Sequence, residues 1–281
     1  MSTPLDPRRH PYRPDLAAAH LKGQVEAERF VEGVPHRVRT GVAGLRGEPD
    51  AAARHTSQVL FGETFTVYDT HDGWSWGQCA TDGYVGWVRG QSLARDVHPP
   101  THMVTAVRSF LLPGPDLKTP PRDAIPLGAP VTVLREVNGY AELAGGGWLF
   151  GKHLSPLDVH EPDLVATAER LLGVPYLWGG RTPLGIDCSG LAQLALLRAG
   201  IPCPRDSDMQ QGEVGTRISE DGAGVAFRRG DLVFFPGHVG LMLDGDQLLH
   251  ATAYTMTVVV EPLADVAARA GGITAVRRLA A

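Results

Sequence analysis

The stretch Asp187-Cys188-Ser189-Gly190 leads directly into the apolar run Leu-Ala-Gln-Leu-Ala-Leu-Leu at residues 191–197, which ends shortly before Gly200. An apolar run of this length closed by a glycine predicts a buried helix with Gly200 just past its end. Cys188 then lies in the first turn, where the partial positive charge of a helix N-terminus favours the thiolate. Because the thiolate is the nucleophilic form of cysteine, Cys188 is a candidate catalytic nucleophile.

A purely structural role is the alternative for Cys188, because most cysteines behave as small buried hydrophobes. Three features favour catalysis: the helix start, the glycine-rich string Tyr-Leu-Trp-Gly-Gly at residues 176–180, and two downstream histidines, His238 and His250. A cysteine nucleophile needs such a histidine as its base. Cys79 and Cys203 have no comparable surroundings in the sequence, and we interpret them as structural.

The sequence also predicts how the two histidines meet. Two mostly apolar runs, residues 238–243 and 247–252, flank Asp-Gly-Asp at 244–246, a pattern typical of a β-hairpin. With a three-residue loop centred on Gly245, Gly240 faces His250, and His238 is its diagonal neighbour on the same face, about 7–8 Å away at the Cα level. A helix that carries a thiol against a sheet that carries two histidines is the arrangement of a cysteine hydrolase.

Composition limits the classes of protein to which the chain can belong. It has 281 residues, of which 43% are hydrophobic, enough for two or three folded domains. The 34 glycines and 22 prolines favour many turns and short strands. A net charge of −5 without a basic stripe argues against a nucleic-acid partner. Three cysteines suit a reducing compartment, and no signal peptide or membrane-spanning run is seen, so we expect a cytoplasmic protein without membrane contact.

Two β-rich segments repeat one another after an N-terminal arm over residues 1–35. The string Gly-Glu-Thr-Phe-Thr-Val at 62–67 aligns with Gly-Ala-Pro-Val-Thr-Val at 128–133, and Trp87 aligns with Trp148. Alternating apolar residues in both copies fit the strands of small barrels. The segments resemble bacterial SH3-like barrels and cover residues 36–97 and 98–158; the alternative is an unrelated β-barrel of the same extent.

The remaining residues, 159–281, carry five strings that resemble the NlpC-type cysteine peptidases. In chain order they are Tyr-x-Trp-Gly-Gly, Asp-Cys-Ser-Gly, Arg-Gly-Asp-Leu, His-Val-Gly and His-Ala. These peptidases are papain-like cell-wall enzymes that cut D-glutamyl–diaminopimelate bonds. The resemblance therefore implies an α+β chain: two small SH3-like β-barrels followed by a papain-like catalytic domain.

The resemblance also implies roles for individual residues. Cys188 is the expected nucleophile, and His238 is the general base that takes the thiol proton and later protonates the leaving amine. His250 is expected to orient His238, with a satisfied core histidine as its alternative. Tyr176 is expected to help line the oxyanion hole, although a packing role would also account for it.

The two barrels narrow the resemblance to dipeptidyl-peptidases that release L-alanyl-D-glutamate from free muropeptides. In those enzymes the first barrel covers one end of the cleft, and acidic residues hold the free amine. The expected substrate-binding residues are Asp187, Ser189, Asp206, Ser207, Glu63, Tyr84 and Trp178. For Glu63 and Tyr84 the alternatives are a solvated carboxylate and a barrel-core tyrosine.

Zinc is a competing use of Cys188, His238 and His250, but their spacing matches no usual zinc pattern, so we expect no metal and no cofactor. The expected partners are short peptides derived from peptidoglycan; nothing in the sequence indicates a protein partner. Two other functions stay open. One is an exported murein hydrolase, amidase or acyltransferase that uses the same cysteine and histidine. The other is a non-catalytic module that binds the cell wall.

Overall fold

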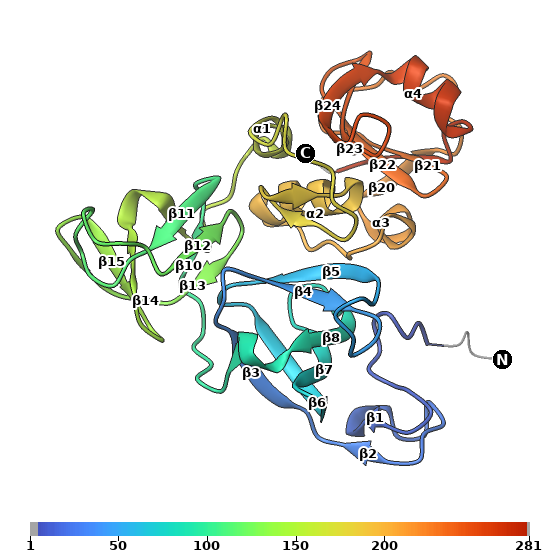
Figure 1. Cartoon of the computed structure of the whole chain (residues 1–281). Helices are drawn as coiled ribbons and strands as arrows, with labels where there is room; N and C mark the ends of the chain where they lie inside the picture. The colour runs from blue at the N-terminus through green and yellow to red at the C-terminus, as the bar shows by residue number, and fades with distance from the viewer. Residues whose placement is uncertain (1–4, 280–281) are drawn as a thin grey trace. The chain divides into compact units, whose positions relative to one another are not determined.

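The computed structural model describes residues 5–279 and divides into two compact units, Met1–Leu157 and Asp158–Ala281 (Figure 1). The first unit consists of short strands linked by turns and 3-10 helices, and the second combines helices with one large sheet. Both helices and strands are therefore present, as expected for an α+β chain.

The first half of the N-terminal unit forms a seven-stranded sheet in the order β5-β4-β8-β7-β6-β3-β9. All pairings within it are antiparallel, as expected for strands joined by tight turns. The bounds are β3 Val34–Val38, β4 Val42–Arg46, β5 His55–Leu60, β6 Thr64–His71, β7 Trp74–Cys79, β8 Val85–Arg89, η2 Gly90–Ser92 and β9 Leu93–Ala94.

The second half of this unit consists of three small sheets, in the orders β13-β10-β17, β11-β12 and β14-β15-β16. Its core is continuous with the first half, since Leu60 and Phe61 pack in one cluster with Val104, Ile125 and Leu149. The bounds are β10 His102–Val104, β11 Arg108–Leu111, β12 Asp123–Pro126, β13 Pro130–Val131, β14 Val133–Val137, β15 Tyr140–Leu143, β16 Trp148–Phe150, η3 Gly151–His153 and β17 Leu154–Pro156.

The sequence repeat in this unit is also a repeat of backbone conformation. Asp72-Gly73 has two consecutive positive φ angles, 45° and 79°, and Asn138-Gly139 has 52° and 78°. Such pairs are typical of tight hairpin turns, which here join β6 to β7 and β14 to β15. Each half also ends with a 3-10 turn, η2 or η3, followed by a short strand that begins at Leu93 or Leu154.

The N-terminal arm, as far as the structure describes it, is packed against the neighbouring sheet. It contains β1 (Ala17–Ala18), the 3-10 turn η1 (Ala19–Leu21) and β2 (Phe30–Val31), and β1 pairs in parallel with β2. The arm is packed because Leu16, which is fully buried, joins Trp74, Trp76 and Trp87 in one hydrophobic cluster.

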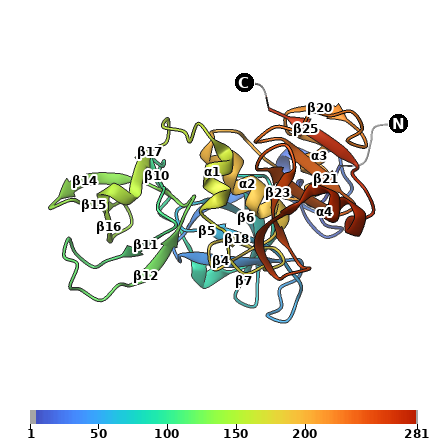
Figure 2. The same cartoon turned by 90° about the horizontal axis from the view of Figure 1, so that it is seen from above.

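The C-terminal unit is built on a six-stranded sheet in the order β20-β25-β21-β22-β23-β24, and Figure 2 shows β20, β25 and β21 side by side. Helix α4 covers one face, where Val266 packs with Val233, Phe235, Met242 and Leu248. The bounds are α1 Leu164–Glu169, β18 Arg181–Thr182, β19 Gly185–Ile186, α2 Cys188–Arg198, α3 Ser207–Glu213, β20 Thr216–Ser219, β21 Leu232–Phe235, β22 His238–Met242, β23 Gln247–Thr252, β24 Thr257–Pro262, α4 Leu263–Ala270 and β25 Ala275–Arg278.

Helix α2 follows the sequence prediction closely. It begins at Cys188, and the Asp187 side chain caps it by accepting a hydrogen bond from the Gly190 N–H. It ends at Arg198, and Gly200 adopts the left-handed conformation, with φ of 76°, just past the end. The helix is buried on nearly all sides, which explains why its sequence is apolar throughout rather than amphipathic.

Within residues 5–279, which the structure describes, no helix is both long enough and apolar enough to cross a membrane.

Candidate active site

Cys188 is almost completely buried at the start of α2, with 8% of its surface exposed. Burial raises the pKa of its thiol to about 12, and the neighbouring Asp187 carboxylate adds to the increase. The backbone N–H groups of Val239 and Ser189 act in the opposite direction but do not prevail. Burial therefore acts against the helix charge and favours the neutral thiol in the resting protein, contrary to the predicted thiolate.

The contact with the Val239 N–H places the Cys188 sulfur beside β22, next to His238. The β22–β23 hairpin has the predicted register: Leu241 pairs with Leu249 and Met242 with Leu248, which continues to Gly240 opposite His250. His238 Nε2 and His250 Nδ1 lie 2.7 Å apart in a hydrogen bond, and the two ring centroids are 5.0 Å apart. The hairpin thus joins the two predicted histidines directly.

His238 is a neutral base in the resting site. Burial lowers its pKa to about 4, and the neighbouring His250 contributes in the same direction. Burial likewise lowers the pKa of His250. A neutral imidazole beside a neutral thiol can take the thiol proton when the sulfur attacks, which is general-base catalysis rather than a preformed ion pair.

Tyr176 is half-buried and faces the same site. Burial raises the pKa of its hydroxyl, and the charges of Cys188 and Asp187 raise it further. The hydroxyl therefore stays protonated and can donate a hydrogen bond. The Tyr176 backbone N–H donates to the Met256 carbonyl at 2.9 Å, which fixes the segment before β18 against the turn that precedes β24.

Asp187 is the centre of a buried hydrogen-bonded network. Its Oδ1 accepts from Arg205 Nη1 at 3.0 Å and from the Gly190 N–H at 2.7 Å, while Oδ2 accepts from Arg205 Nη2 at 2.7 Å and from the Gly179 N–H at 2.8 Å. Arg205 Nη1 also donates to Ser189 Oγ at 2.8 Å. The bidentate pair locks the first turn of α2, and so the backbone of Cys188, in place.

Comparison with known proteins identifies both parts of the chain. Residues 173–270 match the model of the NlpC/P60 family, and residues 45–93 match that of the bacterial dipeptidyl-peptidase Sh3 domain. The chain therefore carries an NlpC/P60 domain and is a cysteine peptidase. The cysteine and both histidines of the candidate site lie within the matched NlpC/P60 residues.

Two relatives align with most of the chain, across both matched domains. Dipeptidyl-peptidase 6 of Lysinibacillus sphaericus is 28% identical over 240 residues, which cover 75% of this chain and 85% of that protein. Gamma-D-glutamyl-L-lysine dipeptidyl-peptidase of Bacillus cereus (strain ATCC 10987 / NRS 248) is 28% identical over 240 residues, covering 74% of this chain and 70% of the relative. The crystal structure of an NlpC/P60 family protein from Bacillus cereus ATCC 10987 superposes with a TM-score of 0.75 at 20% identity, covering 87% of this chain and 99% of that one. This likeness supports the fold.

In the NlpC/P60 domain, two predicted substrate-binding side chains are occupied by internal contacts. Both carboxylate oxygens of Asp187 accept hydrogen bonds from within the chain, and Ser189 Oγ accepts from Arg205 and donates to Asp187 at 3.3 Å. Both residues are buried. The structure therefore gives Asp187 and Ser189 the role of holding the helix start, and their expected contact with substrate stays a prediction.

The two residues predicted from the Sh3 domain are also internal. Glu63 is 3% exposed, and its carboxylate accepts from the Leu60 N–H at 2.7 Å and from Thr81 Oγ1 at 2.9 Å. Tyr84 is buried just before β8. Glu63 stabilises a turn of its own unit and Tyr84 belongs to the core, and their expected binding of substrate stays a prediction.

Three further predicted residues are accessible. Asp206 and Ser207 are half-buried at the beginning of α3, where the Asp206 side chain makes no capping hydrogen bond to the helix. Trp178 is 55% exposed in the segment between Tyr176 and β18. These are the predicted substrate contacts that a ligand could reach.

The sequence analysis missed two residues that extend the histidine pair. His250 Nε2 lies 2.9 Å from Glu261 Oε2, and Arg269 Nη2 donates to the same oxygen at 2.8 Å. Recognising β24 would have revealed Glu261, because Val259 pairs with His250 and Glu261 lies two residues further on the same face. Arg269 lies on α4, which no string in the sequence analysis covered.

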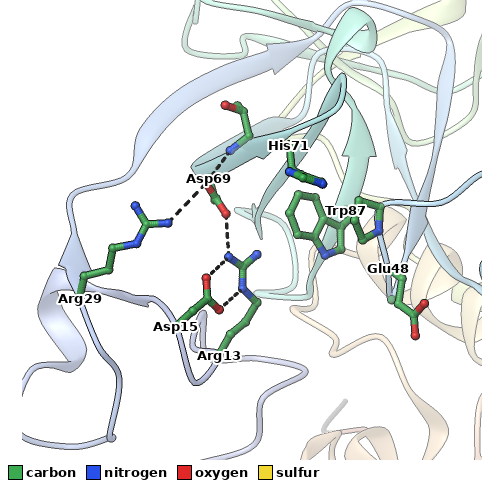
Figure 3. Close-up of a pocket in the computed structure, with 10 residues that line it drawn as sticks. Arg13, Asp15, Arg29, Glu48, Asp69, His71 and Trp87 are labelled. Carbon is green, nitrogen blue, oxygen red and sulfur yellow. Dashed lines mark hydrogen bonds and ion pairs between the residues drawn. The ribbon is translucent and has the colours of Figure 1, made fainter.

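A separate cavity of about 650 Å³ lies in the N-terminal unit and contains none of the predicted site residues (Figure 3). Arg13 lines it and donates to Asp15 at 2.8 Å and to Asp69 at 2.6 Å. The guanidinium also lies over the rings of Trp76 and Trp87, 4.4 and 5.1 Å from their centroids. Since Arg13 of the arm pairs with Asp69 and stacks on two tryptophans of the sheet, the cluster serves to fasten the N-terminal arm to the sheet.

Proposed function

We propose that this peptidase hydrolyses the γ-D-glutamyl–diamino acid bond of short, free cell-wall peptides such as L-Ala-γ-D-Glu-diaminopimelate, in the recycling of released muropeptides. The observation that carries the proposal is the position of Cys188, at the start of a buried helix and beside the strand whose His238 is hydrogen-bonded to His250. The names of these two relatives support the peptide class, since both are dipeptidyl-peptidases and one is named for a γ-D-glutamyl bond.

In the first half of the reaction, His238 takes the proton of the Cys188 thiol while the sulfur attacks the γ-carbonyl carbon of D-glutamate. The carbonyl oxygen becomes an oxyanion, which the Tyr176 hydroxyl and the Cys188 backbone N–H can stabilise. The N–H of Cys188 suits this role because the first residue of a helix has no intrahelical acceptor. His238 then gives its proton to the leaving amine of the diamino acid, and a thioester remains.

In the second half, water attacks the thioester carbonyl carbon, and His238 takes a proton from the attacking water. The thiol is restored when the proton returns to the sulfur, and L-alanyl-D-glutamate leaves as the carboxylic acid product. Because both Cys188 and His238 are neutral at rest, each half-reaction begins and ends with neutral partners.

The remaining features of the proposal concern architecture and substrate contacts. Residues 1–35 form the arm, 36–97 and 98–158 two SH3-like domains, and 159–281 a papain-like catalytic domain; the repeated hairpin turns support a second SH3-like copy. Asp206, Ser207 and Trp178 are the proposed peptide contacts, since they are accessible and a carboxylate suits a substrate ammonium.

The test compares three substrates with the full chain: free L-Ala-γ-D-Glu-diaminopimelate, its N-acetylated form, and intact murein sacculi. We expect kcat/KM for the free tripeptide to exceed that for the acetylated form by at least about tenfold, since charge-assisted hydrogen bonds to the ammonium contribute about 1.5–3 kcal/mol each. Equal values, or ready solubilisation of sacculi, would favour an exported wall hydrolase instead. Lack of any hydrolysis by a folded wild-type protein would favour a binding module.

A further inference from the structure

We propose that Glu261 is a positioning residue of the active site, which sets the tautomer of both histidines and stabilises the proton that His238 receives from Cys188. The relay then runs from Cys188 through His238 and His250 to Glu261, with Arg269 holding its outer end. This inference rests on the proposed cysteine mechanism, but it does not depend on which peptide is cut.

The register of the sheet brings Glu261 to His250. Strands β23 and β24 are antiparallel, and His250 pairs with Val259. Residues two apart in a strand point to the same face, so Glu261 is the diagonal neighbour of His250. Helix α4 covers this face and supplies Arg269, which pairs with the carboxylate at 2.8 Å.

The hydrogen bonds of this relay permit one arrangement of protons. Burial raises the pKa of Glu261, but hydrogen bonds from Arg269 and His250 lower it overall, so the carboxylate is ionised and can only accept. His250 must therefore carry its proton on Nε2, which donates to Glu261 Oε2. Its Nδ1 is then an acceptor, so the bond at 2.7 Å requires His238 to carry its proton on Nε2.

The consequence for catalysis is that His238 Nδ1 is left with a free lone pair. This is the nitrogen available to take a proton, and the relay fixes it before any substrate arrives. Without an obligate acceptor at Glu261, either histidine could adopt the other tautomer, and His238 would present an N–H in place of a base.

The charge of Glu261 also counteracts the effect of burial, which lowers the pKa of both histidines. Its hydrogen bond and its charge both raise the pKa of His250, and its charge raises that of His238. Arg269 works against this by lowering both. The ring of Tyr254 lies 4.2 Å from the Arg269 guanidinium, which keeps that cation at the outer end of the relay. The carboxylate is therefore placed to stabilise the imidazolium that forms during attack.

The experiment measures the rate at which iodoacetamide alkylates Cys188, with the modified peptide identified by mass mapping. Alkylation needs the thiolate but no peptide substrate, so its outcome is separate from that of the proposed function. The variants of the full chain are Glu261→Gln, which is isosteric but uncharged, and Glu261→Asp, which keeps the charge. Glu169→Gln is the matched control, because Glu169 also pairs with an arginine, Arg229, on the exposed side of α1.

We expect Glu261→Gln to slow alkylation at neutral pH by about tenfold, since a charged hydrogen-bond acceptor is replaced by a neutral one. Glu261→Asp should recover most of the rate, and Glu169→Gln should match the wild type, with all four proteins melting at similar temperatures. An unchanged rate in Glu261→Gln overturns the proposal. So does an equal loss in Glu261→Asp accompanied by a lowered melting temperature, which would indicate a structural role alone.

Nitrogen-15 NMR of the wild-type imidazoles tests the tautomers without any variant at Glu261. Resonances are assigned by comparison with His238→Gln and His250→Gln. We expect the proton on Nε2 in both histidines. A proton on Nδ1 of either histidine in the resting protein overturns the relay.

Discussion

The NlpC/P60 domain contains two polar networks that both reach the start of helix α2, and they differ in burial and in how many bonds each member makes. The Asp187–Arg205 network is enclosed: the two side chains are 10% and 1% exposed, and Asp187 accepts from several donors on each oxygen. The histidine relay is linear, and exposure increases along it from 0% at His250 through 15% at Glu261 to 29% at Arg269.

This difference indicates a division of work. A network in which each atom has several partners resists movement, so Asp187 and Arg205 fix where Cys188 lies. A chain in which successive members share a single hydrogen bond can respond to a proton, because a change at His238 alters one bond to the next member. The same unit thus separates the residues that hold the nucleophile from those that move its proton.

The largest effect should come from Cys188, where both networks meet. Cys188→Ala should reduce kcat for the tripeptide by on the order of 10⁴-fold or more, because no other group can form the thioester. Circular dichroism should show an intact fold, since a small side chain is lost. The controls Cys79→Ala and Cys203→Ala remove other buried thiols and should stay active. Turnover near the wild-type rate in Cys188→Ala would reject the mechanism.

The next largest effect tests the enclosed network. Arg205→Met should lower the free energy of unfolding by about 3–5 kcal/mol, because it leaves the Asp187 carboxylate buried without its cation. The measurement is urea denaturation followed by circular dichroism. The double variant Arg205→Met/Asp187→Asn should recover part of the loss, since no buried charge remains and the amide can still cap α2. A loss below about 1 kcal/mol would mean that the network does not hold the helix start.

A smaller effect should appear in acid and tests the relay. The pKa of His238 is lowered to about 4 from 6.5, so the unfolded chain binds a proton on this residue before the folded protein does. The stability that neutral His238 contributes is complete above pH 6.5 and is lost as the pH falls from 6.5 toward 4. At about 1.4 kcal/mol per pKa unit, reduced for partial exposure, the loss amounts to about 1–3 kcal/mol.

His238→Asn provides the comparison for this acid effect, because asparagine does not titrate. Denaturation of both proteins at pH 7 and pH 5 should show a smaller pH dependence in the variant. An identical dependence would mean that His238 is not held neutral by burial, and that the resting site is an ion pair after all.

The structural features that depend on a local sequence pattern, the β22–β23 hairpin and helix α2, could be predicted from the sequence. Asp-Gly-Asp at 244–246 defined the hairpin, and its loop length determined the register that joins His238 to His250. Helix α2 was predicted because an apolar run and a glycine stop are properties of adjacent residues. The NlpC/P60 strings located the cysteine in the same way.

The partners that complete each network could not be predicted in this way. Arg205 lies in the loop between α2 and α3, and no periodicity indicates that its side chain turns inward to Asp187. The substrate role expected for Asp187 followed from the family resemblance, which does not indicate this partner. Likewise, the thiolate prediction for Cys188 considered the helix charge but not the degree of burial, which depends on tertiary packing.

The smallest effect should come from a third network, which has similar chemistry but lies at the surface. Arg229 donates to Asp163 at 2.8 Å and pairs with Glu169 at 2.5 Å, and the three side chains are between 37% and 44% exposed. Arg229→Gln should cost less than about 1 kcal/mol, because exposed charges are already well solvated. The loss should shrink further in 1 M salt, and kcat should not change.

This surface variant tests whether burial explains the different stability contributions of the networks. Arg229 and Arg205 each pair with carboxylates and differ mainly in exposure. If burial is the cause, Arg205→Met should lower the free energy of unfolding far more than Arg229→Gln does. Equal costs would mean that the number of ion pairs matters more than their surroundings. Burial would then not explain why the Asp187–Arg205 network fixes the position of Cys188 while the histidine relay carries its proton.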